Sequence, residues 1–415
     1  MTPKTFVTAG RWPTTFTSLR YPNCRRWFIG QALSLMGTWM QLVAQGWLVY
    51  DLTGSKLALG MISFVGTVPT LFLMLPAGAI SDRMPRRRML LITQTAMMAF
   101  ALILALLTAT RVLQVWHIAA LAFGLGIANS FDAPARQALA VDMVEDRRDL
   151  QNAIALNATV FNMARVVGPA VGGLVLAALG AAWCFALNGL SFLAVLIALV
   201  GMRMPDVVGS SRTERLTDQV KAGLRYTWGS TAIRTVVALV GVSSLFAMSY
   251  SVLMPVYAVD VLHVGEAGLG ALNAAVGAGA LVGSLAVATL SKSTHKGLQL
   301  TIGSLIFPLA LLAFAFSRSF PLSLVWLGVA GFGFVIQNAT SNTLVQSLVS
   351  DELRGRVMSV YTLMFSGAAP FSALLAGGLA QTLGPTAAVV IGAGVFLLFA
   401  LGVFIFVPAL RRQEG

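Results

Sequence analysis

The sequence predicts an all-α membrane protein with twelve transmembrane helices in two six-helix repeats. Hydrophobic residues make up 57% of the 415 positions and charged residues only 10%, whereas a soluble domain carries about 25% charged residues. Apolar stretches of about 20 residues, the length that a spanning helix needs, recur along the chain. Basic residues gather in alternate joints between these stretches. The exterior of the fold is therefore expected to face lipid.

Twelve apolar stretches follow one another, and the joints between them contain charged residues or Gly and Pro. We expect the spanning helices at 27–50, 57–80, 89–110, 114–134, 151–178, 182–202, 233–258, 267–290, 298–317, 321–346, 357–382 and 386–408. An even number of spans places both termini on the same side of the membrane.

The basic residues assign that side to the cytoplasm. Lys56, Arg111 and Arg318 occur in joints on one side, and Arg165 lies inside a predicted helix. The remaining 24 of the 28 Lys and Arg residues fall in the two termini and in the joints of the other side. Because cytoplasmic loops carry an excess of Lys and Arg, both termini are predicted to be cytoplasmic. The net charge of +13 thus reflects topology rather than nucleic-acid binding.

The longest polar interval lies near the midpoint and divides the chain into two halves. The predicted divisions are an N-terminal arm at 1–26, a first half at 27–204, a linker with a short amphipathic helix at 205–231, a second half at 232–408 and a tail at 409–415. One constant offset places Phe123, Gly124 and Asp142 on identical residues at 332, 333 and 351, which supports an internal repeat. Two such halves are one way of building alternating-access transporters.

The joint after the second predicted span has the sequence GAISDRMPRRR from Gly78 to Arg88. It resembles the loop signature of the major facilitator superfamily: a Gly, three residues, Asp-Arg, one residue, a Gly and two or three basic residues. The matching residues are Gly78, Asp82, Arg83, Arg86 and Arg87, with Pro85 in place of the second Gly. The resemblance implies the major facilitator fold and a gating role, in which Asp82 meets the N-terminus of the eleventh helix and latches the outward-facing state. The alternative is that the arginines only fix topology.

The fifth predicted helix contains a second motif, Gly168-Pro169-Ala-Val-Gly172-Gly173. It resembles the Gly-Pro-x-x-Gly-Gly motif of exporters in the same superfamily. Small residues let helices approach closely, and Pro bends a helix. The resemblance implies export, and the alternative is a packing role alone.

Residues at the end of the fourth predicted helix indicate one branch of the superfamily. Together with Arg165, the segment from Asn129 through Asp132 to Gln137 is similar to the bacterial branch that holds macrolide and other drug exporters and the enterobactin exporter. That branch is expected to carry an Arg early in this helix, where the present chain has Trp116 and His117. A proton-coupling role for such an Arg therefore does not transfer.

Polar side chains predict a substrate cavity, because helices 1, 4, 7 and 10 line the path in this superfamily. Five polar residues of the first helix recur at spacings of three and four, which places them on one helix face. The predicted cavity residues are Gln31, Ser34, Thr38, Gln41, Gln45, Arg165, Tyr250, Tyr257, Asn338 and Asn342. The alternative is that the amides join helices through interhelical hydrogen bonds.

Titratable residues near the midplane are few, so each one is a functional candidate. Arg165 lies about 15 Å inside its helix, and it is expected either to pair with Asp132, to contact a substrate anion, or to serve another role. The histidines lie at helix ends or in loops. If transport is coupled to protons, Asp132 and Asp51 are therefore the predicted titrating groups.

These observations predict a secondary active transporter that exports an amphiphilic small molecule, a drug or a siderophore-like metabolite, by alternating access with proton antiport. A nucleotide-binding Gly-x-x-x-x-Gly-Lys-Ser/Thr loop is absent from the sequence, so an ion gradient would supply the energy. The alternative is a transporter or flippase of an anionic lipid-like substrate such as a lysophospholipid, which Arg165 would suit.

Other classes of protein fit the sequence less well. An enzyme would need clustered His, Cys or carboxylates, whereas the three His and two Cys are scattered. A passive channel needs neither a repeat nor a latch, and a receptor is disfavoured because no sizeable soluble domain is present. The expected partners are an amphiphilic substrate, protons and membrane lipids, without nucleic acid, cofactor or metal. We expect a monomer in the bacterial cytoplasmic (inner) membrane.

Overall fold

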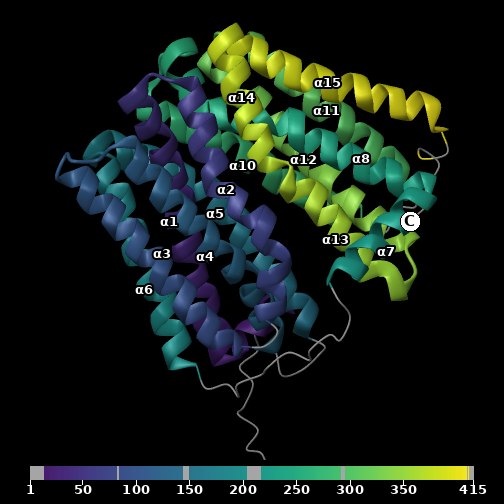
Figure 1. The fold of residues 1–415 in the computed structure, drawn as a ribbon, viewed down its shortest axis with the longest axis horizontal. Helices are drawn as coiled ribbons and strands as arrows, with labels where there is room; N and C mark the ends of the chain where they lie inside the picture. Colours follow the sequence, from purple (N-terminus) through teal and green to yellow (C-terminus); the bar gives the residue numbers. More distant parts are fainter. Residues whose placement is uncertain are drawn as a thin grey trace, which may run out of the picture.

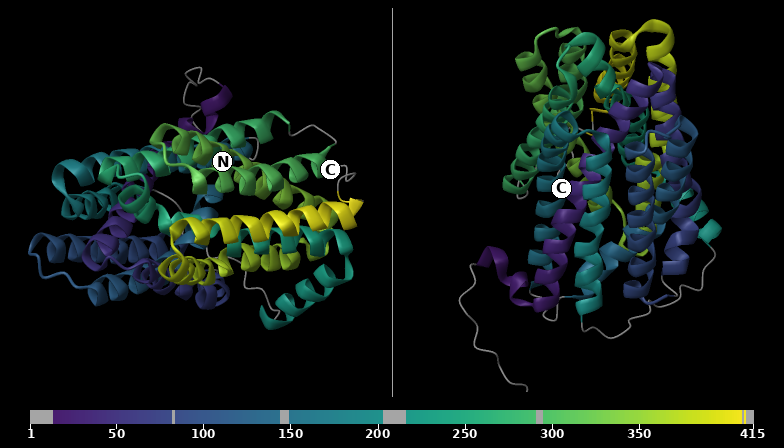
Figure 2. Two further views of the ribbon diagram at one scale, coloured as in Figure 1. Left: turned by 90° about the horizontal axis from the view of Figure 1, so that it is seen from above. Right: turned by 90° about the vertical axis from the view of Figure 1, so that its left-hand side faces the viewer.

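The computed structural model of the chain describes residues 14–81, 84–143, 149–202, 216–290, 295–408 and 410. Within these ranges every regular element is a helix and no strand occurs, so the prediction of an all-α fold is confirmed. The long helices run roughly side by side along one direction (Figure 2).

The first six helices pack into one group, the N-terminal bundle (Figure 1). They are α1 (Pro22–Thr53), α2 (Lys56–Ser81), α3 (Arg86–Ala109), α4 (Val115–Asp142), α5 (Leu150–Leu179) and α6 (Ala181–Gly201). Helix α1 lies between α5 and α6, while α4 lies against both α2 and α3. A short 3-10 helix, Thr14–Arg20, precedes α1 and contacts α5.

The remaining long helices form the C-terminal bundle. They are α8 (Thr231–Phe246), α10 (Gly265–Thr289), α11 (Lys296–Phe316), α12 (Phe320–Leu348), α13 (Asp351–Gly367), α14 (Ala369–Leu383) and α15 (Pro385–Phe406). Helix α7 (Leu216–Gly229) lies in the interval predicted to hold a short linker helix, and it packs on α13 and α8.

Two of the predicted spans are interrupted by proline. The span expected at 233–258 is α8 followed by a 3-10 helix (Ala247–Leu253), the short α9 (Met254–Val256) and a π-helix (Tyr257–Val261). The span expected at 357–382 is divided into α13 and α14 at Gly367 and Ala368. Pro255 and Pro370 lie at these breaks, where each lacks the backbone N–H that would continue the helical hydrogen bonding.

Eleven segments of the described chain are long and apolar enough to cross a membrane, with each interrupted span counted once. Helix α1 is not among the eleven, although it has 32 residues and lies within the N-terminal bundle. Its glutamines make it less apolar than the other long helices. By length and composition, one fewer segment of the described chain could cross a membrane than the twelve expected.

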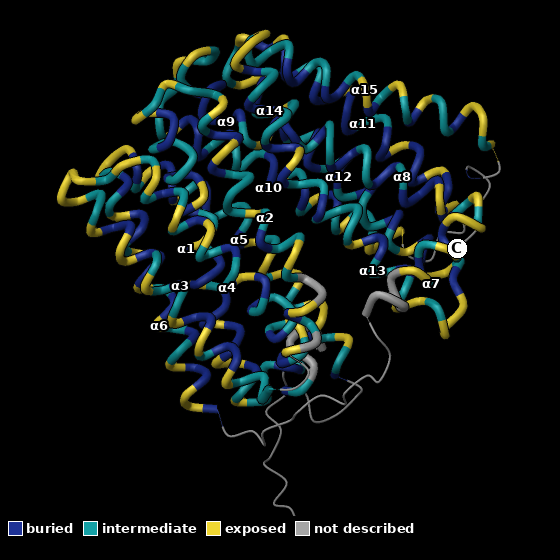
Figure 3. The backbone as a smooth tube through the Cα atoms, in the orientation of Figure 1, coloured by how far each residue is buried: buried dark blue, intermediate teal, exposed yellow. Residues whose placement is uncertain are grey.

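Exposed residues lie along the outward faces of many helices (Figure 3), and many of them are large and apolar. On α6 Ile197 is 70% exposed, and on α15 Leu398 and Phe406 are 71% and 84% exposed. A soluble surface rarely carries so much contiguous exposed apolar area. These faces therefore suit contact with lipid.

The turn between α5 and α6 has the same geometry as the turn between α14 and α15. Gly180 has φ 86° and ψ 172°, and Gly384 has φ 89° and ψ 161°. Side chains with a Cβ avoid this region, so glycine is required at both turns. Together with Gly54, these two glycines mark the end of the bundles away from α7, which we call the distal end.

The two bundles touch through glycines in the half of the molecule that includes the distal end. A Cβ atom added to Gly173 of α5 would lie 2.6 Å from the Cα of Gly270 on α10. A Cβ atom added to Gly377 of α14 would lie 3.0 Å from the Cα of Gly60 on α2. Toward α7 the bundles diverge (Figure 1). The close backbone contacts between the bundles thus lie on one side of the middle.

Candidate functional site: a cavity between the two bundles

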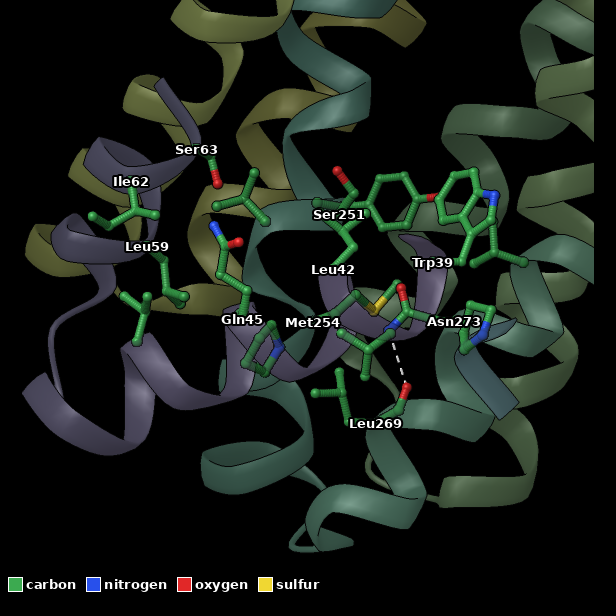
Figure 4. A pocket seen from close by; sticks show the side chains of 18 of the residues that line it. Trp39, Leu42, Gln45, Leu59, Ile62, Ser63, Ser251, Met254, Leu269 and Asn273 are labelled. Atoms are coloured by element: carbon green, nitrogen blue, oxygen red, sulfur yellow. Dashed lines mark hydrogen bonds between the residues drawn. The ribbon is translucent and has the colours of Figure 1, made fainter. Parts of the chain in front are cut away.

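A cavity of about 320 Å³ lies where the two bundles meet. Its walls come from α1, α2 and α5 of the N-terminal bundle and from the 3-10 helix, α9 and α10 of the C-terminal bundle. Figure 4 shows Gln45 and Ser63 on one side of this space, and Trp39 and Asn273 on the other. Both bundles therefore contribute to one site.

Most of the cavity wall is apolar. Leu42, Val49, Ile62, Met254 and Leu269 are among the apolar lining residues. The polar lining residues are Gln45, Ser63, Arg165, Tyr250, Ser251 and Asn273. A largely apolar pocket with a few placed polar groups is the usual form of a small-molecule site.

Arg165 is the one charged residue of the described lining. Its guanidinium carbon lies 5.8 Å from the ring centroid of Trp39 on α1 and 5.9 Å from that of Phe334 on α12. Both distances allow a cation–π interaction. The expected alternative of a pair with Asp132 is wrong, because the described carboxylate partner of Arg136 is Asp132, whereas Arg165 forms no ion pair among the described residues.

The Gly-Pro-x-x-Gly-Gly motif lies at the junction of three helices. Gly168 and Gly172 face α1, because added Cβ atoms would lie 2.6 Å from the Trp39 side chain and 2.9 Å from the Met40 backbone. Gly173 faces Gly270 of the other bundle, and Pro169 lines the cavity. The motif therefore places the cavity wall next to the contact between bundles.

The five polar residues predicted on one face of α1, from Gln31 to Gln45, lie in different environments. Gln45 lines the cavity, whereas Gln31, Ser34 and Gln41 are buried and outside its lining. The side-chain amide of Asn188 on α6 donates a hydrogen bond to Gln41 Oε1 at 2.6 Å. Thr38 is exposed, and its hydroxyl donates to the carbonyl of Ser34. In this conformation the structure thus brings Gln45, and not the whole stripe, to the cavity.

Of the other predicted cavity residues, some line the cavity and others do not. Tyr250 lines the cavity and packs edge to face on Phe307. Tyr257 is fully buried, with its ring 4.5 Å from that of Phe314. On α12, Asn342 accepts a hydrogen bond from Gln346, and the carbonyl of Asn338 accepts one from Tyr361. The two asparagines and Tyr257 lie outside the lining of this cavity.

The two predicted titrating carboxylates have very different surroundings. Asp132 is 1% exposed and accepts hydrogen bonds from Thr93 at 2.9 Å and Gln94 at 2.8 Å, while Arg136 lies 3.6 Å away. Asp51 is exposed at the end of α1. Neither residue lines the cavity.

The predicted gating residues are described only in part. Arg86 forms an ion pair with Asp142 at the end of α4, and Arg87 donates hydrogen bonds to the carbonyls of Leu199 and Val200 at the end of α6. Gly78 lies in α2 with open space where a Cβ would be. Asp82 and Arg83 lie outside the described residues.

Trp39, Ser63 and Asn273 are cavity residues that the sequence reasoning missed. Trp39 carries no polar pattern that would set it apart from other apolar residues of α1, and Asn273 has no polar neighbour three or four positions away in α10. Ser63 was missed although Thr67 and Thr70 follow it at spacings of four and three on one face of α2. Trp39 and Gln45 are six positions apart, about 120° around the helix, so the periodicity that found Gln45 does not point to Trp39. Within the described residues, no group of three His, Cys, Asp or Glu residues could hold a metal ion.

Two helical bundles that share a largely apolar cavity between them match the major facilitator fold that the sequence motifs indicated. The chain belongs to the family described as transmembrane secretion effector, which matches residues 13–414. This membership confirms the resemblance to exporters of the superfamily that the sequence motifs indicated.

Relatives of known function cover nearly the whole chain. It is 30% identical to the multidrug efflux pump Tap of Mycolicibacterium fortuitum over 391 residues, which are 91% of this chain and 94% of that protein. It is 25% identical to the enterobactin exporter EntS of Citrobacter koseri over 398 residues, 94% of this chain and 93% of that one.

Solved transporters share the fold at low sequence identity. A POT family transporter superposes with a TM-score of 0.74 at 14% identity, covering 94% of this chain and 96% of that chain. The nucleoside transporter NupG superposes with a TM-score of 0.68 at 12% identity, covering 93% of this chain and 99% of that chain. The chain has the fold of these proteins. Its family and its relatives show that it is a multi-pass membrane transporter, and the expected relation to efflux pumps and siderophore exporters agrees with these relatives.

Proposed function

We propose that the protein is a secondary active exporter that moves an amphiphilic small molecule out of the cytoplasm by alternating access. The single observation that carries this proposal is the largely apolar cavity of about 320 Å³ whose wall is shared by both bundles. A site between two bundles becomes accessible from one side or the other when the bundles rock. The similarity to a drug pump and to a siderophore exporter supports export of a drug or siderophore-like metabolite.

We further propose that α1 is the twelfth span, which puts both termini and α7 on the cytoplasmic side of the bacterial inner membrane. The backbone contacts Gly173–Gly270 and Gly60–Gly377 then close the outer side of the cavity. The divergence of the bundles toward α7 corresponds to an inward-facing state (Figure 1). In this scheme the division into halves at 27–204 and 232–408 describes the two moving parts of a monomer.

The proposed energy source is proton antiport, with Asp132 and Asp51 as the titrating groups. Asp132 is the stronger of the two, because its carboxylate is buried beside a cation and sits at the contact between α3 and α4. Asp82 keeps its proposed role as the latch of the outward-facing state. The relatives do not favour a lysophospholipid flippase, and we do not propose one.

Flux through purified protein in proteoliposomes tests the proposed function. Efflux of the lipophilic dye ethidium and of the catecholate dihydroxybenzoate would be followed under an imposed pH gradient. We expect gradient-driven movement of at least one probe. Trp39→Ala, which removes a wall of the cavity, should abolish that movement, whereas Trp116→Ala, at an exposed tryptophan on α4, should not. Equal flux in both variants would contradict transport through this cavity.

A further inference from the structure

Arg165 lies in the cavity wall without a carboxylate partner. The ion pairs of the described residues do not include it. A charge near the middle of a membrane protein normally pairs with an opposite charge or faces a watery cavity or a ligand. Since the described structure offers no opposite charge, the partner of this guanidinium is expected to come from outside the chain.

Aromatic rings hold the guanidinium in place. Trp39 belongs to the N-terminal bundle and Phe334 to the C-terminal bundle, and each ring centroid is within 6 Å of the guanidinium carbon. A ring face attracts the cation but accepts none of its in-plane hydrogen bonds. Within the described residues, no acceptor receives a hydrogen bond from Arg165. Its N–H donors are therefore available to a ligand.

The rest of the lining does not offset this positive charge. Apart from Arg165, the polar lining residues are neutral amides, hydroxyls and a phenol, and the described lining contains no Asp or Glu. A cationic substrate would meet a like charge in an apolar surrounding, which disfavours binding. An anionic group would find a planar cluster of donors suited to a carboxylate.

We propose that Arg165 is the recognition point for an anionic group, such as a carboxylate or catecholate, on a small aromatic or aliphatic amphiphile, and that the cavity selects anions over matched cations. This inference rests on the proposed function and names its substrate class. The apolar lining receives the body of the substrate, and Trp39 offers a ring for stacking. A volume of about 320 Å³ suits a small amphiphile, because it lies at the lower end of the range for drug-sized ligands.

The test compares three probes that share one body: pyrenebutyrate, its neutral primary amide, and pyrenebutyl trimethylammonium. Calorimetric titration of full-length protein in lipid nanodiscs, with empty nanodiscs subtracted, gives each Kd. We expect the carboxylate to bind on the order of tenfold or more tightly than the amide, because a charge-assisted hydrogen bond is stronger than a neutral one. The cation should bind more weakly than the amide.

Variants at position 165 test whether the guanidinium causes the preference for the carboxylate probe. Arg165→Gln should bring the three Kd values together, and Arg165→Lys should keep part of the preference for the carboxylate. Arg111→Gln, at an exposed arginine outside the cavity, should leave the wild-type order unchanged. Thermal melting in the same nanodiscs checks that each variant is folded.

The outcomes separate this inference from the proposed function. If wild-type protein binds all three probes with equal affinity, Arg165 is not an anion site, while the exporter proposal stands. If Arg165→Gln weakens every probe equally, its role is structural and the inference is overturned. Displacement of pyrenebutyrate by lysophosphatidylglycerol would overturn the assignment of a small substrate. Binding of none of the probes to folded protein would overturn the inference, whereas the exporter proposal is tested separately by the flux of ethidium and dihydroxybenzoate.

Discussion

The Tyr50 hydroxyl of the N-terminal bundle donates a hydrogen bond to the Asp260 carboxylate of the C-terminal bundle, with an oxygen–oxygen distance of 2.6 Å. The ammonium of Lys56 lies 3.8 Å from the same carboxylate oxygen. The contact lies at the distal end, where Gln381 on α14 also accepts hydrogen bonds from the backbone amides of Lys56 and Leu57 at the start of α2. Polar contacts thus reinforce the glycine contacts between the bundles.

Asp260→Asn is expected to weaken this closure and raise the population of outward-open protein. Loss of the carboxylate charge weakens the hydrogen bond from Tyr50 and removes the attraction to Lys56, which together are worth about 1 kcal/mol at this partly exposed site, or roughly a fivefold change in population. The measurement is the rate at which a membrane-impermeant maleimide applied from outside labels a cysteine at position 45. The native Cys24 and Cys184, both buried, would be replaced first.

Glu266→Gln is the matched control for that measurement. Glu266 is a partly exposed carboxylate in the first turn of α10, six positions from Asp260, with no hydrogen bond or ion pair among the described residues. Its labelling rate should equal that of the parent. Equal acceleration in both variants would show that general charge at the distal end matters and that the contact between Tyr50 and Asp260 does not.

Gly173→Ala should force the bundles apart at the crossing of α5 and α10. The new Cβ would lie 2.6 Å from the Cα of Gly270, and backbone atoms cannot move aside as a flexible side chain can. We expect the closed distal end to be destabilised by about 1–3 kcal/mol, seen as faster labelling at position 45. Gly394→Ala on α15, where a Cβ meets nothing within 4 Å, should leave the rate unchanged.

Asp132→Asn should separate proton coupling from transport itself. If the buried carboxylate carries the proton, the variant loses flux driven by a pH gradient but retains exchange of substrate down its own gradient. We also expect a loss of stability of about 1–3 kcal/mol, because Arg136 loses its charged partner. Both fluxes are measured in the same proteoliposomes. Undiminished pH-driven flux would exclude Asp132 as the coupling group.

Gln41→Leu should lower stability and Gln45→Leu should change substrate affinity, although the two residues are one helical turn apart. Gln41 accepts the hydrogen bond from Asn188, so its loss leaves a buried amide unpaired and lowers stability by about 1–3 kcal/mol. Gln45 lines the cavity, so its loss should change substrate affinity and spare the melting temperature. Calorimetric binding and thermal melting of both variants check this. A loss of affinity in Gln41→Leu equal to that in Gln45→Leu would contradict the assignment.

Much of the fold could be predicted from the sequence, because hydropathy and the placement of charges act over whole helices. The breaks at Pro255 and Pro370 were missed, since proline in a membrane helix can also be accommodated without an interruption. In the cavity, polar periodicity found Gln45 but could not separate it from Gln41. Both lie on one face of α1, and which neighbour covers each part of that face is decided by tertiary packing.

The surroundings of Arg165 also could not be predicted from the sequence. Its depth could be estimated from its position in α5, but its surroundings could not. The rings of Trp39 and Phe334 come from α1 and α12, and no sequence spacing relates them to Arg165. Likewise, the repeat offset that places Asp142 on residue 351 also places Asp51 on Asp260, whereas among the described residues the structure gives a partner across the bundles to Asp260 and not to Asp51.

The interruption between α13 and α14 gives the two pieces of that span different attachments. Helix α14 is fastened to α2 of the opposite bundle, and α13 carries the linker helix α7. Pro370 removes a backbone tie just past the joint. Because α7 packs on α13 whereas α14 packs on α2, we expect a displacement of α7 to move α13 more than α14. In the proposed alternating-access cycle, such a hinge would let one end of the pathway open while the other stays closed.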